Sequence, residues 1–201
     1  MRVIVVGGTG TIGSAVADAL QGEHEVVRVG HTSGEHRVDL ASRSSIRELY
    51  GAVEPFDALI SAAGEARFGA LPELSDEDFD ISLHNKMRGQ IDLVRLGLEA
   101  VRDGGSFTLT TGVLATEPIE GSAAISPVNA GVEGFVRAAA LEMPRDTRVN
   151  AVSPPWVAET LEAMGRDPSA GLPAAEVAKA YVAAVEGSTN GTVLDARDYA
   201  G

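Results

Sequence analysis

The sequence of 201 residues contains no cysteine. The chain therefore forms no disulfide bond, offers no thiolate to a metal ion and has no cysteine nucleophile. A chain without cysteine also fits a reducing compartment, and we expect a cytoplasmic protein. None of the histidines has a carboxylate partner at a spacing typical of metal ligands, so we predict no metal site. The four histidines are His24, His31, His36 and His84.

Basic residues are scarce as well, because 16 Lys and Arg stand against 29 Asp and Glu, giving a formal net charge of −13. A surface of this sign repels nucleic acid and anionic membranes, and we expect neither as a partner. Long apolar runs are missing, since the opening run at residues 3–6 is too short for a signal peptide or a membrane span. The length and a hydrophobic content of 44% suit a single domain covering residues 1–201.

Short apolar runs rich in β-branched residues alternate with longer amphipathic stretches along most of the chain. Runs that are apolar at successive positions suit strands covered on both faces, as in a parallel sheet. The alternation predicts an α/β fold, a doubly wound parallel sheet of about seven strands with helices on both faces. We predict strands at residues 3–6, 25–29, 37–40, 58–61, 106–110, 148–152 and 192–194. We predict helices at residues 12–20, 44–50, 76–102, 129–141 and 174–185, and a surface loop at 166–173.

A glycine-rich stretch follows the first predicted strand directly. Gly8, Gly10 and Gly13 fit the pattern G-x-G-x-x-G, in which glycine permits a tight turn and a close approach to a pyrophosphate. The start of the next helix then offers free N–H groups and a positive dipole end to the anion. This context favours dinucleotide binding over a purely structural glycine turn. The loop predicted to bind comprises Gly7, Gly8, Thr9, Gly10, Thr11, Ile12 and Gly13.

The loop after the second predicted strand carries polar residues without negative charge, namely His31, Thr32 and Ser33. A protein that prefers NAD usually places Asp or Glu here to accept hydrogen bonds from the ribose. No carboxylate occurs in this loop before Glu35, whereas Arg28 and Arg37 are close by in the sequence. The pattern favours NADP(H) over NAD(H), with ordinary solvated loop residues as the alternative.

Five further segments, in order along the chain, are similar to motifs of the short-chain dehydrogenase/reductase family. They are Val38-Asp39-Leu40, Ser61-Ala62-Ala63-Gly64, Val132-Glu133-Gly134-Phe135, the stretch from Arg148 to Val157, and Gly191-Thr192-Val193-Leu194-Asp195. With the glycine loop, this resemblance covers nearly the whole chain. It implies a single-domain Rossmann-type fold with a nicotinamide cofactor across the carboxyl edge of the sheet. Beyond the glycine loop and residues 31–33, it implies cofactor contacts at Asp39, Leu40, Ala62, Ala63, Gly64, Thr110, Asn129, Pro154, Trp156 and Val157.

The chain departs from the family at the positions that carry its chemistry. Family members use a Ser, a Tyr thirteen residues later and a Lys four residues beyond the Tyr. Counting from residues 132–135 places Gly112, Ile125 and Asn129 at these positions without a gap. In the family the Tyr is the general acid, the Lys lowers its pKa and the Ser orients the carbonyl. Isoleucine has no proton to donate, so this mechanism cannot operate here, although Asn129 keeps the capacity to bond the nicotinamide ribose.

Three polar residues are candidates for a substitute catalytic site. Lys86 falls at the position of a helix Asn in the family, and Thr111 adjoins the vacant Ser position at the end of a predicted strand. His84 lies close to Lys86 and is the one histidine that we consider as a replacement acid. A solvated helix lysine and a purely structural strand threonine are the alternatives for the first two.

Two functions therefore remain open at this point. The first is an NADP(H)-dependent oxidoreductase that moves a hydride to or from a small carbonyl, alcohol or enone with an unusual proton source. The second is a catalytically inactive NADP(H)-binding sensor or scaffold. By the same resemblance, helices 76–102 and 129–141 form the surface through which family members assemble, so we expect a homodimer or homotetramer. The stretch between residues 157 and 173 is short for a substrate lid, so the substrate site is open or is completed by another subunit.

Overall fold

The computed structural model describes all 201 residues as a seven-stranded sheet with the strand order β3-β2-β1-β4-β5-β6-β7. Every neighbouring pair of strands is parallel, which confirms the predicted doubly wound sheet. The strands are β1 Arg2–Val6, β2 Glu25–Gly30, β3 His36–Arg37, β4 Phe56–Ser61, β5 Val101–Thr110, β6 Arg148–Ser153 and β7 Val193–Asp195.

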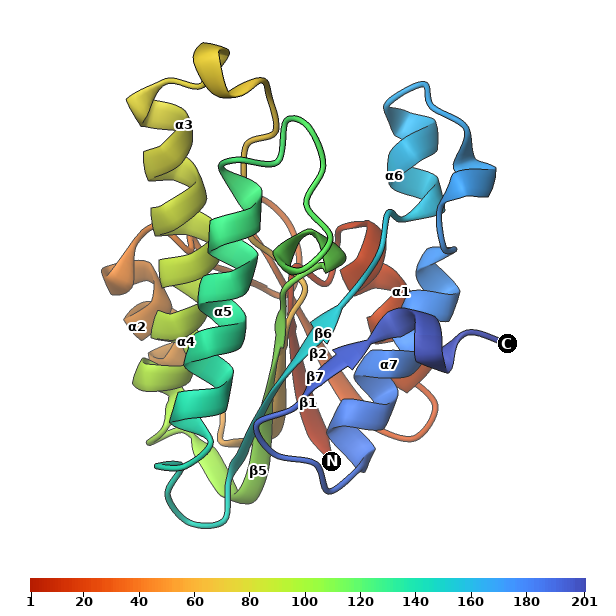
Figure 1. Cartoon of the computed structure of the whole chain (residues 1–201). Helices are drawn as coiled ribbons and strands as arrows, with labels where there is room; N and C mark the ends of the chain where they lie inside the picture. The colour runs from red at the N-terminus through yellow and green to blue at the C-terminus, as the bar shows by residue number, and fades with distance from the viewer.

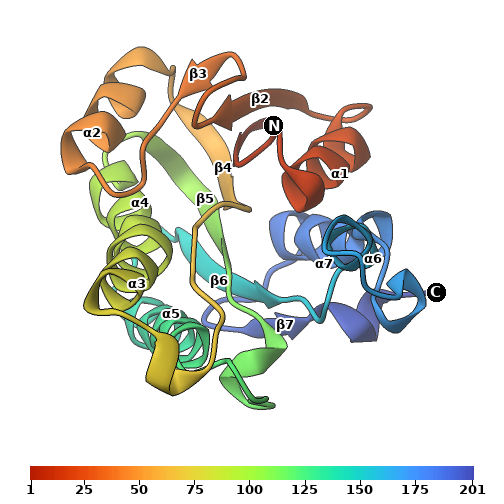
Figure 2. The ribbon, with the colours of Figure 1, turned by 90° about the horizontal axis from the view of Figure 1, so that it is seen from above.

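Helices cover both faces of the sheet, and the two faces enclose separate hydrophobic cores (Figures 1 and 2). One face packs against α2, α4 and α5, and the other packs against α1 and α7. Successive residues of β1 divide between the cores, since Ile4 and Val6 face the first and Val3 and Val5 face the second. All four are at most 1% exposed, which explains the unbroken apolar run in the sequence.

The helices are α1 Thr11–Leu20, α2 Arg43–Ala52, α3 Asp76–Ile81, α4 Gly89–Gly97, α5 Ile125–Ala139, α6 Ala158–Ala163 and α7 Ala174–Glu186. A π-helix, η2 (Ser82–Arg88), joins α3 to α4, and Ser75 and Asp78 form a capping box at the beginning of α3. None of the helices is both long and apolar enough to span a membrane.

Several predicted elements differ from those in the structure, among them the strand predicted at 37–40, which is β3 at His36–Arg37. The predicted helix 76–102 ends at Gly97, and β5 begins at Val101, which pairs with Phe56 of β4 and is buried. The predicted helix 129–141 begins instead at Ile125, because Pro127 lies in the first turn, where a missing N–H costs no helical hydrogen bond. The predicted loop 166–173 follows a helix that the sequence did not indicate, α6.

The strand order reverses beside β1, which lies between β2 and β4. In open parallel sheets a ligand binds in the crevice at the carboxyl ends of the strands where the order reverses. The loops after β1, β2, β4, β5 and β6 meet at this edge, which Figure 2 shows from above. The fold therefore brings the predicted glycine loop and the predicted catalytic positions to the same edge.

Candidate cofactor and active site

The glycine loop packs so closely against its neighbours that side chains are excluded. Gly7 has a φ of +83°, and a Cβ there would lie 2.6 Å from the carbonyl oxygen of Ala62 in the loop after β4. A Cβ on Gly13 would overlap the carbonyl oxygen of Gly7. Gly10 precedes α1 without a side-chain cap, so the first N–H groups of that helix remain free. The loop is thus a cradle for an anionic group at a helix N-terminus.

A cavity of about 390 Å³ lies beside this loop and holds several of the predicted cofactor residues. Gly7, His31, Asp39, Leu40, Ala63 and Gly64 are among its lining residues. Sequence reasoning missed two polar side chains of the lining, those of Glu65 and Asn85. The side-chain oxygen of Asn85 accepts a hydrogen bond of 2.7 Å from the backbone N–H of Glu65, which ties the loop after β4 to η2. We refer to this cavity as the adenosine-side cavity.

The charged groups around residues 31–33 are not arranged as the sequence suggested. Arg28 does not extend toward a 2′-phosphate, because its guanidinium donates to the carboxylate of Asp18 at 2.6 Å and to the carbonyl oxygen of Gly8 at 3.2 Å. Arg28 therefore braces the glycine loop. The carboxylate of Glu35 accepts from the backbone N–H of Arg28 at 3.0 Å, so it closes the turn. His31, Thr32 and Ser33 are exposed.

A second cavity, of about 180 Å³, holds all three positions at which the chain departs from the family. Gly112, Ile125 and Asn129 line it together with Lys86, Thr110, Thr111, Pro154, Trp156 and Val157. The fold thus brings together the three positions that the resemblance assigns to the family's catalytic residues, here a glycine, an isoleucine and an asparagine. We refer to this cavity as the nicotinamide-side cavity.

Lys86 is the only ionisable residue that lines the nicotinamide-side cavity. Its side chain projects from η2 and is 8% exposed, and its Nζ donates a single hydrogen bond of 3.4 Å to the carbonyl oxygen of Thr111. Burial lowers the pKa of Lys86 from 10.5 to about 8, because the charged form loses water without gaining a carboxylate. Gly64 makes room for this side chain, since a Cβ there would lie 2.9 Å from Cγ of Lys86.

Asn129 offers an acceptor that has no partner. Its side-chain nitrogen is 3.5 Å from the carbonyl oxygen of Gly112, while its Oδ1 is buried and forms no hydrogen bond. A buried polar atom of this kind normally finds a donor. A hydroxyl group of a nicotinamide ribose would supply one, so Asn129 and the glycine cradle fit a nicotinamide dinucleotide at both ends.

The hydroxyl groups of the two threonines at the end of β5 point away from the cavity. Thr111 Oγ1 lies 3.1 Å from the backbone oxygen of Asn129 and 3.2 Å from a carboxylate oxygen of Glu133, both on α5. Thr110 Oγ1 donates to the carbonyl oxygen of Ser61 at 2.5 Å and lies 2.6 Å from the hydroxyl of Tyr181. The Thr111 hydroxyl thus directs its one proton at α5, and the structure does not present that proton to a substrate oxygen.

His84 lies outside both cavities. Its Nδ1 is 2.9 Å from the carbonyl oxygen of Asp80, and the side chain is exposed on the outer surface of η2. Two positions apart on a helix, His84 and Lys86 project to different sides. The structure therefore does not bring His84 to the site where a replacement acid is needed.

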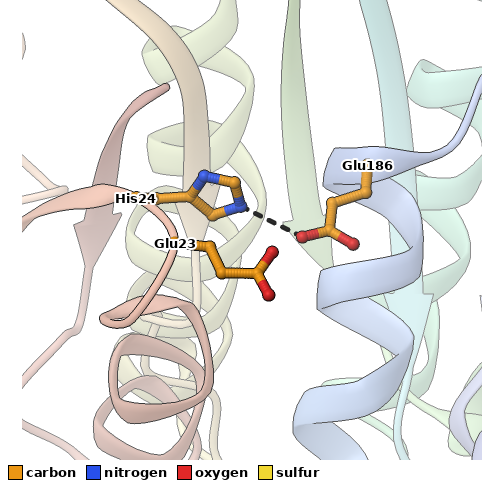
Figure 3. A group of neighbouring side chains, drawn as sticks. All are labelled: Glu23, His24 and Glu186. Atoms are coloured by element: carbon orange, nitrogen blue, oxygen red, sulfur yellow. Dashed lines mark hydrogen bonds and ion pairs between the residues drawn. The ribbon is translucent and has the colours of Figure 1, made fainter.

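One group of possible metal ligands occurs at the opposite end of the sheet (Figure 3). Nε2 of His24, at the start of β2, forms a contact of 3.0 Å with a carboxylate oxygen of Glu186 at the end of α7, and Glu23 lies beside them. Sequence spacing did not reveal this group because 162 positions separate His24 from Glu186. The contact with Glu186 already uses the imidazole nitrogen that would bind a metal, and we assign the group a structural role.

Seven parallel strands, a glycine cradle at the first strand–helix turn and a crevice at the carboxyl edge define a dinucleotide-binding Rossmann-type protein. Residues 10–188 match the family model described as Enoyl-(Acyl carrier protein) reductase. The 3-oxoacyl-(acyl-carrier-protein) reductase of Mus musculus is 28% identical over 174 residues, covering 76% of this chain and 74% of that protein. The chain belongs to this family, within the short-chain dehydrogenase/reductase oxidoreductases that use a nicotinamide cofactor.

Solved structures resemble the chain over nearly its whole length. The protein lin1944 from Listeria innocua aligns with a TM-score of 0.93 and 38% identity, covering 97% of this chain and 98% of that chain. A small-chain dehydrogenase in complex with NADPH aligns with a TM-score of 0.85 and 27% identity, covering 97% of this chain and 95% of that chain. The likeness extends over both cavities, because the aligned regions include nearly all of the sheet edge.

Proposed function

We propose that the protein is an NADPH-dependent reductase of small carbonyl or enone substrates in which Lys86 supplies the proton. The observation that carries this proposal is the position of Lys86, the only ionisable side chain in the cavity that holds Gly112, Ile125 and Asn129. A pKa of about 8 is close to the operating range of a general acid at neutral pH. The buried ammonium group also stabilises negative charge that develops on a substrate oxygen.

In this proposal the bound cofactor supplies hydride chemistry. The chain binds the cofactor, orients the substrate and protonates the substrate oxygen. The glycine loop and the start of α1 hold the pyrophosphate, and Asn129 Oδ1 accepts from the nicotinamide ribose. Lys86 Nζ delivers a proton to the substrate oxygen and takes one back from solvent. The carbonyl oxygen of Thr111 holds the ammonium group in place, and Glu133 in turn fixes Thr111.

The preference for NADPH rests on the absence of a carboxylate among residues 31–34, directly after β2, where one would repel the 2′-phosphate. His31, Thr32 and Ser33 are exposed donors, and Glu35 is bound to the backbone of Arg28. A solved relative of similar fold is named as a complex with NADPH. We expect tighter binding of NADPH than of NADH.

The alternative function is a nucleotide-binding protein without turnover. The direction of the Thr111 hydroxyl favours it, because the hydroxyl group beside the vacant Ser position is directed at α5 and not at a substrate carbonyl. The deciding experiment first confirms NADPH binding by calorimetry and then measures NADPH oxidation with a panel of aldehydes, ketones, quinones and enones. Reduction by the wild-type protein that is lost in Lys86→Met supports the proposal. Tight NADPH binding with no reduction across the panel supports the alternative.

We also propose a homodimer or homotetramer assembled through α3, η2, α4 and α5. The buried carboxylate of Asp92 on α4 forms ion pairs with Arg43, Arg88 and Arg95. Each arginine contributes one guanidinium nitrogen, at 2.6–3.0 Å. The remaining guanidinium nitrogens form a basic patch, while the start of α3 is acidic. An antiparallel pairing of two copies would place each acidic start near the basic patch of the other copy. The acidic residues are Asp76, Glu77 and Asp78.

The exposed face of α5 supports the same assembly. Ala130, Gly134 and Ala138 are exposed in succession along this helix, and Leu141 beyond its end is 88% exposed. Gly131, in contrast, serves packing within the subunit, because a Cβ there would overlap Met87 of η2. Light scattering at micromolar concentration tests the proposal. A monomer in wild type contradicts it, and dissociation of Arg88→Glu/Arg95→Glu supports the charge pairing.

A further inference from the structure

Trp156 separates two cavities at the carboxyl edge of the sheet. It lines the nicotinamide-side cavity and also an outer cavity of about 240 Å³, in the lobe formed by α6 and the turn that follows it. Leu161, Arg166, Asp167 and Ala170 complete the lining of this outer cavity. A ligand with its reactive group beside Lys86 would therefore extend past the indole ring toward Arg166.

The indole ring of Trp156 is held by contacts on two sides. Phe68 from the loop after β4 packs edge-on against it, with ring centroids 5.9 Å apart and an angle of 76° between the planes. The guanidinium carbon of Arg166 lies 5.5 Å from the centroid of the indole ring. These contacts orient an aromatic wall beside the entrance, and Phe68 is still 41% exposed.

Arg166 forms no ion pair in a chain whose net charge is −13. Two acidic side chains of the same lobe have other partners. Asp167 accepts from the backbone N–H of Ser169 at 2.9 Å, and Glu159 accepts from the backbone N–H of Ala174 at 3.0 Å, at the start of α7. Because these carboxylates cap helical turns, the guanidinium at the entrance keeps its hydrogen-bond donors free.

We propose that the outer cavity is a subsite for a carboxylate or phosphate group on the substrate. The substrate class is then an aromatic or otherwise apolar carbonyl compound with a distal anionic group. Its carbonyl lies against Lys86, its apolar body lies on Trp156 and its anionic group is bound by Arg166. The guanidinium plane presents paired donors to the two oxygens of such a group, which a neutral ester cannot match. This inference rests on the proposed reductase function for the position of the carbonyl.

The sequence contains a single tryptophan, so its fluorescence reports binding at this wall without any turnover. The experiment titrates the protein, with NADP⁺ bound, with 4-carboxybenzaldehyde, with its methyl ester and with 4-formylphenyl phosphate. In wild type we expect both anionic aldehydes to bind about tenfold more tightly than the ester at low ionic strength. Arg166→Gln should reduce the difference to less than twofold, and Arg166→Lys should keep part of it.

Arg47→Gln is the matched control, because Arg47 is another arginine without an ion pair and lies on α2 beside a groove away from the sheet edge. It should leave the preference for the anionic compounds unchanged. Equal binding of aldehyde acid and ester to wild type, or an unchanged preference in Arg166→Gln, overturns the subsite. If the anionic aldehydes bind selectively but no NADPH is oxidised, the subsite is supported and the reductase function is contradicted. Reduction of acid and ester with equal KM contradicts the subsite and keeps the reductase function.

Discussion

The two halves of the cleft are built from different parts of the chain. The adenosine half is shaped largely by backbone, because Gly7 and Gly13 let the loop after β1 approach its neighbours and leave N–H groups free. The nicotinamide half is shaped by side chains, chiefly Lys86, Ile125 and Asn129. The half that is formed by backbone tolerates few amino-acid substitutions. In the half that is formed by side chains, substitutions can change the chemistry while the backbone stays the same. The three positions that the resemblance assigns to the family's catalytic residues line the second half.

The largest effect that we expect comes from one side chain in the nicotinamide half. Lys86→Met should lower kcat for reduction by about 10³-fold, since a positioned general acid contributes about 10²–10⁴-fold. NADPH affinity should change less than about threefold, because in this proposal the free N–H groups at the start of α1, and not Lys86, hold the pyrophosphate. Turnover and calorimetry on the same preparation check both values. His84→Ala is the control, and a loss of activity there equal to that of Lys86→Met would contradict the assignment.

The same lysine predicts a dependence of stability on pH. Its pKa is about 8 in the folded chain and about 10.5 in the unfolded chain, so the unfolded state binds more protons between these values. The stability of the wild type relative to Lys86→Met should therefore rise by about 3 kcal/mol from pH 8 to pH 10.5. Denaturant unfolding of both proteins at several pH values measures this difference. A parallel pH dependence in the two proteins would show that Lys86 is not buried as described.

Cofactor binding in the adenosine half should depend on the size of a substituted side chain rather than on its polarity or charge. Gly13→Val should weaken binding of both NADPH and NADH by at least about 100-fold, because its side chain meets the carbonyl oxygen of Gly7. Circular dichroism should show that the sheet remains folded. Gly22→Ala is the matched control, since a Cβ there meets nothing within 4 Å. If Gly13→Val bound both cofactors as tightly as the wild type does, the adenosine half would not be formed by close backbone packing as described.

Cofactor choice should depend on the loop after β2. NADPH should bind more tightly than NADH by about 1–3 kcal/mol, the range of charge-assisted hydrogen bonds. His31→Asp should reverse the preference by repelling the 2′-phosphate and accepting from the ribose. Calorimetry at matched ionic strength gives both affinities. Equal or tighter binding of NADH to the wild type would contradict the preference.

The smallest effect concerns the end of the sheet opposite the cleft. His24→Ala should lower the free energy of unfolding by about 0.5–1 kcal/mol, because the contact with Glu186 is partly exposed. NADPH affinity and kcat should not change. Chemical denaturation and turnover together check this. A clear change in kcat would show that the two ends of the sheet are coupled.

The parallel sheet was predictable because buried parallel strands need unbroken apolar runs, as residues 3–6 show. The glycine loop was predictable for a related reason, since only glycine fits at Gly7 and Gly13. The direction of the Thr111 hydroxyl was not predictable, because Glu133 on α5 sets it across a separation of 22 residues. The outer cavity was also missed, because its position depends on α6, a helix too short to leave a periodic pattern.

The π-helix η2 makes the positions of Asn85 and Lys86 in the cleft depend on the number of residues in this segment. The N–H of Gly89 donates to the carbonyl oxygen of His84, five residues earlier, so this segment holds one residue more than a regular helix would. Asn85 binds the loop after β4, and Lys86 reaches Thr111 from the same turn. Loss of a single codon here would turn the flanking helices by about 100° relative to each other. An in-frame deletion of an apolar residue of η2 would then turn Asn85 and Lys86 together relative to one flanking helix, although every polar residue of the segment is still present.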